Sequence, residues 1–332
     1  MVVKDMMPNF ELFQPKQVKD ALAILDSYGK DAWKMAGGYD SLVWFKERIK
    51  RPKAVVDLSG ISEMQGIKET PEGVEIGALT TLTDVENNSI IKTKYRLLSD
   101  AVAKVASPQI RHAGTIGGNA SQDARCLYYR YGLPCYRAGG NTCFADTPEG
   151  VNREHALFES DRCVAVSPSD GAPALVALDA KFVLKSSGGE RVIGGEEFFV
   201  GPKVDITHMT STKPGEILTA VRIPKAWANA HFYFEKVADR NTWDFPLVNV
   251  AAAMQVQNGT VRDARIVCGG VSAVPRRLTS VEQIIKGQPL NENLAKLAGQ
   301  SASRGARPLN YNGFKIPLME NLVLRAVRDA KA

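Results

Sequence analysis

Residues 111–121 read RHAGTIGGNAS and contain an adjacent glycine pair, Gly117 and Gly118. Because glycine has no side chain, such a stretch lets backbone N–H groups converge on an anion such as phosphate. Thr115 adds a hydroxyl donor and Asn119 adds an amide donor to the same stretch. A single glycine pair also marks an ordinary turn. This stretch alone therefore leaves a phosphate-binding loop and a plain turn both open.

A second glycine pair strengthens the phosphate interpretation. Residues 34–42 read KMAGGYDSL, so that a short apolar approach ends at Gly37 and Gly38. A helix starting after Gly38 directs the positive end of its dipole toward a bound anion, and the Ser41 hydroxyl is a further donor. Neither stretch has the G-x-G-x-x-G or Walker spacing, so a Rossmann or P-loop nucleotide site is not indicated.

Composition limits the class of protein. The chain has 332 residues, of which 44% are hydrophobic and 23% charged, which favours two or three globular domains. The net charge is +6, but lysines and arginines are spread along the chain, so we do not expect a nucleic-acid partner. No apolar run approaches the ~20 residues of a membrane span, and MVVKDMMPNF does not resemble a secretory signal. We therefore expect a cytoplasmic protein without a membrane span.

The segments around the glycine stretches have an α/β pattern. Apolar residues on one helical face predict a helix over residues 18–28, which Gly29 ends. A strand at 33–36, a helix at 41–50 and a strand at 54–58 follow as a small βαβ-like unit. We predict a strand and turn at 74–82 and helices at 97–106 and 171–180. After residue 228 the pattern indicates antiparallel strands with an Asn258-Gly259 hairpin, followed by helices at 294–302 and 318–330.

Four of the five cysteines lie in one stretch, with the spacing C-x8-C-x7-C-x19-C: Cys126, Cys135, Cys143 and Cys163. An odd cysteine number without an export signal argues against a disulfide framework and favours metal ligation. The spacing lacks C-x2-C pairs, so it does not distinguish zinc from iron and sulfur. The four histidines are dispersed, which disfavours a zinc enzyme site. Cys268 lies in a strand-like run, and we expect it to be a packed core thiol.

Taken in order along the chain, these motifs resemble the flavin-binding medium subunit of molybdenum hydroxylases. This family includes xanthine dehydrogenases, aerobic carbon monoxide dehydrogenases and aldehyde oxidoreductases. The resemblance covers nearly the whole chain and rests on AGGYD at 36–40, TIGGN at 115–119, SPSDGAPAL at 167–175, PGEILTAVRIP at 214–224, FEKVADR at 234–240 and ARIVCGGVSAVPRR at 264–277. It implies an α+β fold, with a two-part FAD-binding domain of the vanillyl-alcohol-oxidase-like type and a smaller C-terminal α+β domain.

The resemblance also implies domain limits and FAD contacts. It places FAD-binding subdomain 1 at 1–60, subdomain 2 at 61–226 with a cysteine-rich insert at about 121–165, and the C-terminal domain at 227–332. Asp170 is expected near the adenosine, and Lys236 with Ile217 or Leu218 near the isoalloxazine ring. The implied FAD-binding residues are Ala36, Gly37, Gly38, Tyr39, Asp40, Ser41, Thr115, Gly117, Gly118, Asn119, Ser169, Asp170, Ile217, Leu218 and Lys236. Tyr39 departs from the small Thr or Ser that is usual after the first glycine pair.

The cysteine-rich insert is similar to that of the flavin subunits of 4-hydroxybenzoyl-CoA reductase and certain bacterial aldehyde oxidoreductases. RCLYYRYGLPC at 125–135 and NREHALFESDRCVAVSPSD at 152–170 carry this similarity. It implies a [4Fe-4S] cluster bound by Cys126, Cys135, Cys143 and Cys163. A zinc-bound insert, and buried thiols without metal, are the alternatives.

The function implied by the resemblance is electron transfer within a larger complex. The expected partners are a small [2Fe-2S] subunit, a large molybdopterin subunit of the aldehyde or aromatic acyl-CoA type, and an external acceptor or donor such as ferredoxin, a quinone or NAD. Substrate chemistry is then expected on the molybdenum subunit. The competing hypothesis is a non-catalytic nucleotide-binding or assembly module whose insert is held by zinc.

Overall fold

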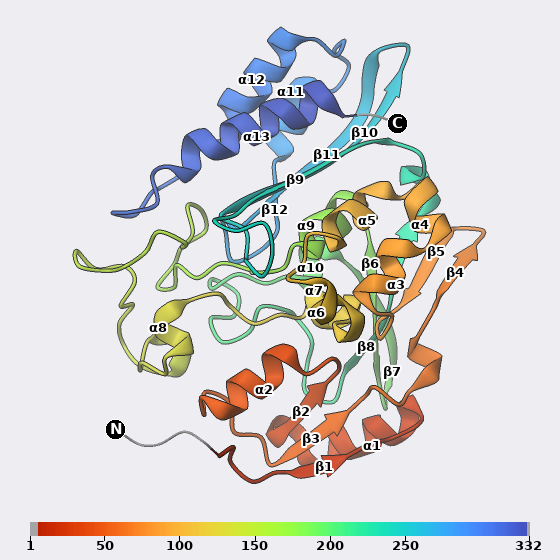
Figure 1. Ribbon diagram of the computed structural model, residues 1–332, viewed down its shortest axis with the longest axis vertical. Helices are drawn as coiled ribbons and strands as arrows, with labels where there is room; N and C mark the ends of the chain where they lie inside the picture. The colour runs from red at the N-terminus through yellow and green to blue at the C-terminus, as the bar shows by residue number, and fades with distance from the viewer. Residues whose placement is uncertain (1–5, 331–332) are drawn as a thin grey trace.

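The structure, a computed structural model, describes residues 6–330. Within these residues, three β-sheets follow one another along the long axis, from the N-terminal sheet to the C-terminal sheet (Figure 1). Residues 1–5 and 331–332, which belong to the first and last expected domains, lie outside the described residues. Between residues 6 and 330, no helix is both long enough and apolar enough to cross a lipid bilayer.

The first sheet is small and parallel. It contains β1 (Glu11–Phe13), β3 (Ala54–Asp57) and β2 (Ala32–Met35), in the order β1-β3-β2. Helix α1 (Val18–Tyr28) buries Val18, Ala21, Leu22 and Leu25, and Gly29 ends it with φ +53°. Helix α2 (Tyr39–Lys46) begins two residues before the predicted position, because Gly38 with φ +80° acts as its N-cap. The predicted βαβ unit is confirmed, whereas β1 was not predicted.

The second sheet is antiparallel and forms the centre of the molecule. Its order is β4 (Ile67–Thr70), β5 (Gly73–Gly77), β8 (Ile217–Pro224), β6 (Lys181–Ser186) and β7 (Gly189–Gly194). The segments between its strands carry short helices: α3 (Leu82–Asn87), α4 (Ser89–Lys94), α5 (Arg96–Val102), α6 (Pro108–Ala113), α7 (Ile116–Ala120), α9 (Gly171–Ala177) and α10 (Gly195–Phe198). The helices predicted at 97–106 and 171–180 are confirmed as α5 and α9.

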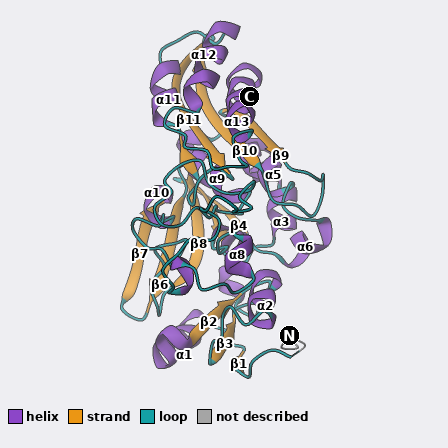
Figure 2. Ribbon diagram, turned by 90° about the vertical axis from the view of Figure 1, so that its left-hand side faces the viewer, coloured by secondary structure: helices purple, strands orange, loops and turns teal. Residues whose placement is uncertain are grey.

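The third sheet is antiparallel and lies at the C-terminal end. It runs β12 (Arg276–Arg277), β11 (Thr260–Gly269), β10 (Val248–Gln257), β9 (His231–Val237). Helices α11 (Thr279–Ile285), α12 (Glu292–Ala302) and α13 (Lys315–Asp329) lie beside it (Figure 2). The predicted hairpin is confirmed, because Asn258 and Gly259 both have positive φ, 51° and 74°.

Side chains of β10 alternate between two cores, as expected for a sheet covered on both faces. Val250 and Ala252 belong to the core with α11, α12 and α13, whereas Ala251 and Ala253 belong to the central core with α5 and α9. Cys268 is fully buried in the C-terminal core. The prediction that Cys268 is a packed core thiol is confirmed.

The insert at 121–165 contains only short helical pieces, α8 (Leu127–Arg130) and a 3₁₀ turn over Tyr136–Ala138. The first residue of α13 and the segment before this helix hold the insert in place. Asn312 Nδ2 donates to the carbonyls of His155 and Ala156, and Lys315 Nζ donates to those of Glu154, His155 and Gly270. Both Asn312 and Lys315 are completely buried. The insert is therefore ordered by contacts with the C-terminal domain.

Candidate functional site

A cleft of about 820 Å³ lies where the first sheet meets α7 and the start of β8. This volume is within the usual range of ligand sites, about 300–1,000 Å³. The cleft is lined by all but three of the residues expected to bind FAD: Ala36, Gly37, Gly38, Tyr39, Asp40, Ser41, Thr115, Gly117, Gly118, Asn119, Ile217 and Leu218. The structure therefore brings the two glycine stretches together on one cavity, although they are far apart in the sequence.

The first glycine loop offers unused backbone donors. Within the described part of the chain, no acceptor is paired with the N–H groups of residues 37–41, and the first N–H that bonds back into α2 is that of Leu42, to the Gly38 carbonyl at 2.9 Å. Free N–H groups at the positive end of a helix form an anion site. Gly37 is required here, because a Cβ atom would collide with the Ala113 carbonyl of α6. This loop can hold a phosphate group.

The second glycine loop differs from the first in its backbone hydrogen bonds. The N–H groups of residues 116–119 donate within the protein, to Thr80 O, Ala78 O, Thr115 Oγ1 and Thr115 O, at 2.9–3.0 Å. These N–H groups already have partners within the protein, so residues 116–119 differ from the free donors of the first loop, and their contact with FAD stays a prediction. The Thr115 hydroxyl accepts from Gly118 and keeps its own proton for donation. The loop's remaining contribution to an anion is this hydroxyl.

The two glycines of this loop have different surroundings. A Cβ on Gly117 would lie 2.8 Å from both Cβ and O of Ala78, so Gly117 is needed for packing against the end of β5. A Cβ on Gly118 would lie 3.0 Å from Thr115 Oγ1 and 4.0 Å from the Cβ of Ala36 on the opposite loop. Gly118 therefore keeps open the space between the two glycine loops.

A buried chain of amides and hydroxyls joins both loops to α9. Asn119 Oδ1 accepts from Ser169 Oγ at 2.7 Å and from the Gly171 N–H at 3.2 Å. Asn119 Nδ2 donates to Gln122 Oε1 at 3.1 Å, and Gln122 Nε2 donates to Asp40 Oδ2 at 2.7 Å. Ser169 thus supports Asn119 and does not line the cleft. No sequence pattern indicated Gln122, because its role depends on the meeting of segments that are distant along the chain.

Tyr39 stands where a small Thr or Ser is usual after the first glycine pair. Its hydroxyl points away from the free N–H groups of residues 37–41. The Tyr39 hydroxyl donates to the Gln109 carbonyl of α6 at 3.4 Å, and 47% of the side chain is exposed. Its N–H still belongs to the free set at the start of α2. The phenol therefore links the first loop to α6, while the backbone of residue 39 keeps its place at the anion site.

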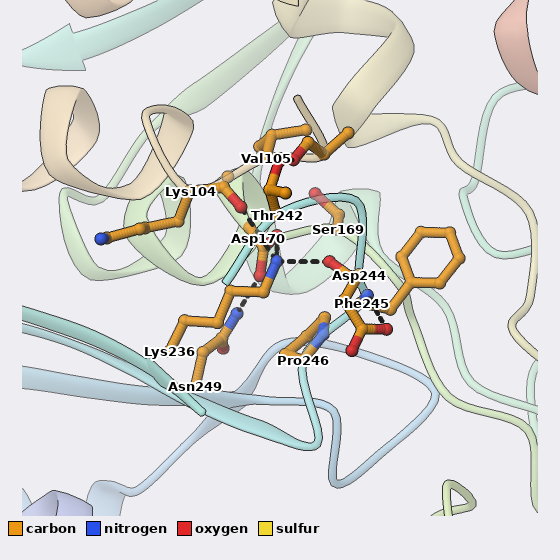
Figure 3. A network of polar contacts seen from close by, with 12 residues as sticks. Lys104, Val105, Ser169, Asp170, Lys236, Thr242, Asp244, Phe245, Pro246 and Asn249 are labelled. Carbon is orange, nitrogen blue, oxygen red and sulfur yellow. Dashed lines mark hydrogen bonds and ion pairs between the residues drawn. The ribbon is translucent and has the colours of Figure 1, made fainter. Parts of the chain in front are cut away.

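Asp170 and Lys236 form a buried ion pair outside the cleft lining (Figure 3). Lys236 Nζ donates to Asp170 Oδ2 at 2.6 Å, and to the carbonyls of Lys104 and Asp244 at 2.9 and 2.6 Å. Asn249 Nδ2 donates to Asp170 Oδ1 at 2.9 Å. The resemblance implied that Asp170 and Lys236 contact opposite ends of FAD, whereas the structure brings their charged atoms together; their contacts with FAD stay a prediction.

This pair joins the central domain to the third sheet. Burial raises the pKa of Asp170 to about 6, an effect that Lys236 opposes, so the carboxylate is ionised at neutral pH. Replacing Lys236 by Met should lower the free energy of unfolding by about 3–5 kcal/mol, since Asp170 keeps a buried charge without its partner. Chemical denaturation measures this.

Lys104→Met is the matched control for that experiment. Lys104 contributes only its carbonyl to the network, and its own side chain is exposed. We expect a change within about 0.5 kcal/mol for this variant. Equal effects of the two substitutions would contradict a specific role for the buried pair.

Sequence reasoning missed Lys34 of β2, which also lines the cleft. Lys34 Nζ donates to the Glu216 carbonyl at 2.9 Å. Burial lowers the pKa of Lys34 to about 8, and the charge of Glu216 offsets only part of this. The available signal was a lysine between Trp33 and Met35 in an otherwise apolar strand.

A second, smaller cavity lies in the insert, and all four of its cysteines line it: Cys126, Cys135, Cys143 and Cys163. All five cysteines of the chain are free thiols. Burial raises the pKa of Cys126 to about 12, and nearby Cys163 and Cys135 raise it further. Cys268 lies in the C-terminal core, apart from this cavity. The structure thus separates the cysteines into the two groups that the sequence suggested.

Polar and aromatic side chains also line the cysteine cavity or contact its thiols. His155 is buried, and its Nε2 lies 3.3 Å from Cys126 Sγ. Arg137 lines the cavity, donates to the Ile206 carbonyl at 2.8 Å and forms an ion pair with Asp123. Tyr129 lines the cavity too, and its ring lies 5.5 Å from that of Trp44.

The cysteine cavity and the cleft share one wall. Asp123 and Trp44 line the cleft, whereas their partners Arg137 and Tyr129 line the cysteine cavity. Each of these contacts joins one side chain of the cleft directly to one of the cysteine cavity. Groups bound in the two cavities would therefore be separated by two side chains in direct contact, one from each lining.

Comparison with known families accounts for this arrangement. The profile of the FAD binding domain in molybdopterin dehydrogenase matches residues 8–226. The chain belongs to this family. The profile of the CO dehydrogenase flavoprotein C-terminal domain matches residues 233–330. The protein is an FAD-binding medium subunit of the molybdenum hydroxylase family, as the sequence motifs predicted.

Several relatives of this medium subunit match along almost their whole length. The carbon monoxide dehydrogenase medium chain of Hydrogenophaga pseudoflava is 27% identical over 98% of both chains. The aldehyde oxidoreductase FAD-binding subunit PaoB of Escherichia coli is 32% identical, over 90% of this chain and 91% of its own. A solved carbon monoxide dehydrogenase from Hydrogenophaga pseudoflava superposes with a TM-score of 0.77, at 26% identity and 98% coverage of each chain. The predicted fold class is confirmed.

Proposed function

We propose that this medium subunit binds FAD in the glycine-lined cleft and a [4Fe-4S] cluster in the cysteine cavity, and that it transfers electrons between subunits of a molybdenum-dependent oxidoreductase. The observation that carries the proposal is the common wall of the two cavities, formed by Asp123 with Arg137 and by Trp44 with Tyr129. When bound, FAD accepts two electrons and releases them singly. A shared wall suits exchange between such a group and a one-electron carrier.

The residues of the cleft suit FAD. The free N–H groups of residues 37–41 and the Thr115 hydroxyl are donors for the pyrophosphate. Ile217 and Leu218 offer an apolar surface for the flavin ring. The proposed set of FAD contacts is therefore narrower than the sequence implied, with Asn119 and Ser169 as supports and with Asp170 and Lys236 as an ion pair between domains.

The cysteine cavity supplies four thiols, the ligand number that both a [4Fe-4S] cluster and a structural zinc ion use. Among residues 6–330, no three His, Cys, Asp or Glu side chains are already arranged around a metal position, so the choice of iron and sulfur rests on the similarity of the insert to those of cluster-binding flavin subunits. A four-iron cluster spreads its four cysteine ligands around a larger core. Cys126, Cys135, Cys143 and Cys163 line one cavity and are proposed as its ligands.

The proposed partners follow from the family. The relatives are described as medium chains and FAD-binding subunits, so the full complex has further subunits. We propose a small [2Fe-2S] subunit, a large molybdopterin subunit that carries out substrate chemistry on an aldehyde or aromatic acyl-CoA, and an external electron acceptor or donor such as ferredoxin, a quinone or NAD. Electrons from substrate would reach the medium subunit through the [2Fe-2S] centres, and a reductase would reverse this direction.

Anaerobic purification of the complete complex tests the proposal. FAD released by denaturation, together with iron, sulfide and zinc contents, should give one FAD and four iron atoms per medium subunit after subtraction of the [2Fe-2S] iron. The isolated medium subunit should show flavin absorbance with a broad iron-sulfur band. Stoichiometric zinc without flavin or iron would contradict the proposal and support an assembly module.

A further inference from the structure

Lys34 faces the cleft because of the alternation of side chains along β2. Its neighbours Trp33 and Met35 pack against the core that contains Trp44 and Phe45. Lys34 extends toward the start of β8, where its Nζ donates to the Glu216 carbonyl, while Trp33 also reaches the cleft lining. A lysine is thus placed between the first sheet and the second, on the wall of the cleft.

The positive charge of Lys34 is not neutralised by a carboxylate. Glu216 is the nearest candidate, but Arg191 binds both of its carboxylate oxygens, at 2.7 and 2.8 Å, and the Lys213 N–H binds one of them at 2.7 Å. Among the described residues, no carboxylate forms an ion pair with Lys34. The pKa of Lys34 is lowered because the effect of burial exceeds the opposing effect of the Glu216 charge. Lys34 therefore has two N–H donors and a full charge available to a ligand.

The position of Lys34 favours the flavin ring over the pyrophosphate. Lys34 bonds to residue 216, which directly precedes the apolar pair Ile217 and Leu218 at the start of β8. The free N–H groups that suit phosphate lie beyond the end of β2, in residues 37–41. Apolar cleft residues are suited to a large flat ring, and a cation beside such a ring acts on its charge.

We propose that the Lys34 ammonium lies beside the flavin ring and stabilises the negative charge that the ring gains on reduction. The inference rests on the proposed function, because it requires FAD in the cleft. It gives Lys34 the place beside the flavin ring that the resemblance had implied for Lys236. Lys34 also fixes the start of β8 through the Glu216 carbonyl, so that the charge and the apolar wall are held together.

The test is a redox titration of the FAD-loaded complex carrying Lys34→Met. At a fixed solution potential near the midpoint, the ratio of reduced to oxidised flavin should fall about tenfold, which is about 30 mV for a two-electron couple. Lys34→Arg should keep the ratio within about twofold of wild type, because it retains the charge. Lys19→Met, on the exposed face of α1, is the matched control for loss of a lysine and should leave the ratio unchanged.

Other outcomes distinguish a failure of the inference about Lys34 from a failure of the proposed FAD binding. An unchanged ratio in Lys34→Met overturns the inference while leaving FAD binding intact. Loss of FAD from Lys34→Met and Lys34→Gln, with normal content in Lys34→Arg, assigns the charge to the phosphate groups and also overturns it. Wild-type complex without FAD contradicts the proposed function itself. Melting curves of all variants identify any that fail to fold, and Lys34→Gln then replaces Lys34→Met in the titration.

Discussion

Serine at any one of Cys126, Cys135, Cys143 or Cys163 is expected to remove most iron and acid-labile sulfide from the medium subunit. All four thiols line one cavity, and a four-iron cluster uses four thiolates. Loss of a ligand should also loosen residues 121–165, because metal binding and local folding are coupled. Iron and sulfide analysis, with proteolysis of the insert, measures both effects.

Cys268→Ser is the matched control, because it makes the same chemical change in the C-terminal core. This variant should keep its iron, although burial of an unpaired hydroxyl is expected to cost about 1–3 kcal/mol of stability. FAD should largely remain in all five variants, since the insert contributes only Ser121, Gln122 and Asp123 to the cleft lining. Wild-type iron content in a Cys135→Ser protein, or iron loss on changing Cys268, would contradict the four-ligand assignment.

Gly118→Val is expected to reduce FAD content more than tenfold. The new Cβ atom would point across the cleft toward Ala36 and fill the space between the two glycine loops. Because the loop's N–H groups already bond within the protein, the fold itself should change little. Released flavin per chain, measured by fluorescence after denaturation, is the readout, with thermal melting alongside.

Two other glycines give controls for this prediction. Gly188→Val makes the same substitution in the β6–β7 turn, where a Cβ would make only an ordinary contact with Ser186 Oγ at 3.7 Å, and should keep full FAD. Gly117→Val should lower both FAD content and melting temperature, because its side chain collides with Ala78. Full FAD in Gly118→Val would show that the cofactor does not pass between the loops.

Short-range residue patterns and the order of motifs along the chain were sufficient to predict local structure and the family. The βαβ unit around the first glycine pair, the Asn258-Gly259 hairpin and the separation of Cys268 from the other cysteines all follow from short-range patterns, and the structure agrees with them. The order of motifs also identified the family, which the profiles confirm.

The sequence did not indicate contacts in which a residue's partner comes from a distant segment. The N–H groups of TIGGN bond to Ala78 and Thr80, which no spacing within that motif indicates. Lys236 pairs with Asp170, 66 positions away, and Gln122 meets Asp40, 82 positions away. The apolar neighbours of Lys34 indicated only a strand. The role of Lys34 depends on its contact with Glu216 at the start of β8, which lies far along the chain.

The contacts of Asn312 and Lys315 with the insert have a consequence for biosynthesis. The bonded residues Asn312 and His155 are 157 positions apart, so the ribosome has made most of the chain before these hydrogen bonds can form. Domains generally fold from the N-terminus during synthesis. The glycine-lined cleft can thus take shape early, whereas the cysteine cavity reaches its final form only after α13 has docked. Iron-sulfur assembly factors would accordingly meet a nearly complete polypeptide, and maturation would proceed in the order flavin first, cluster last.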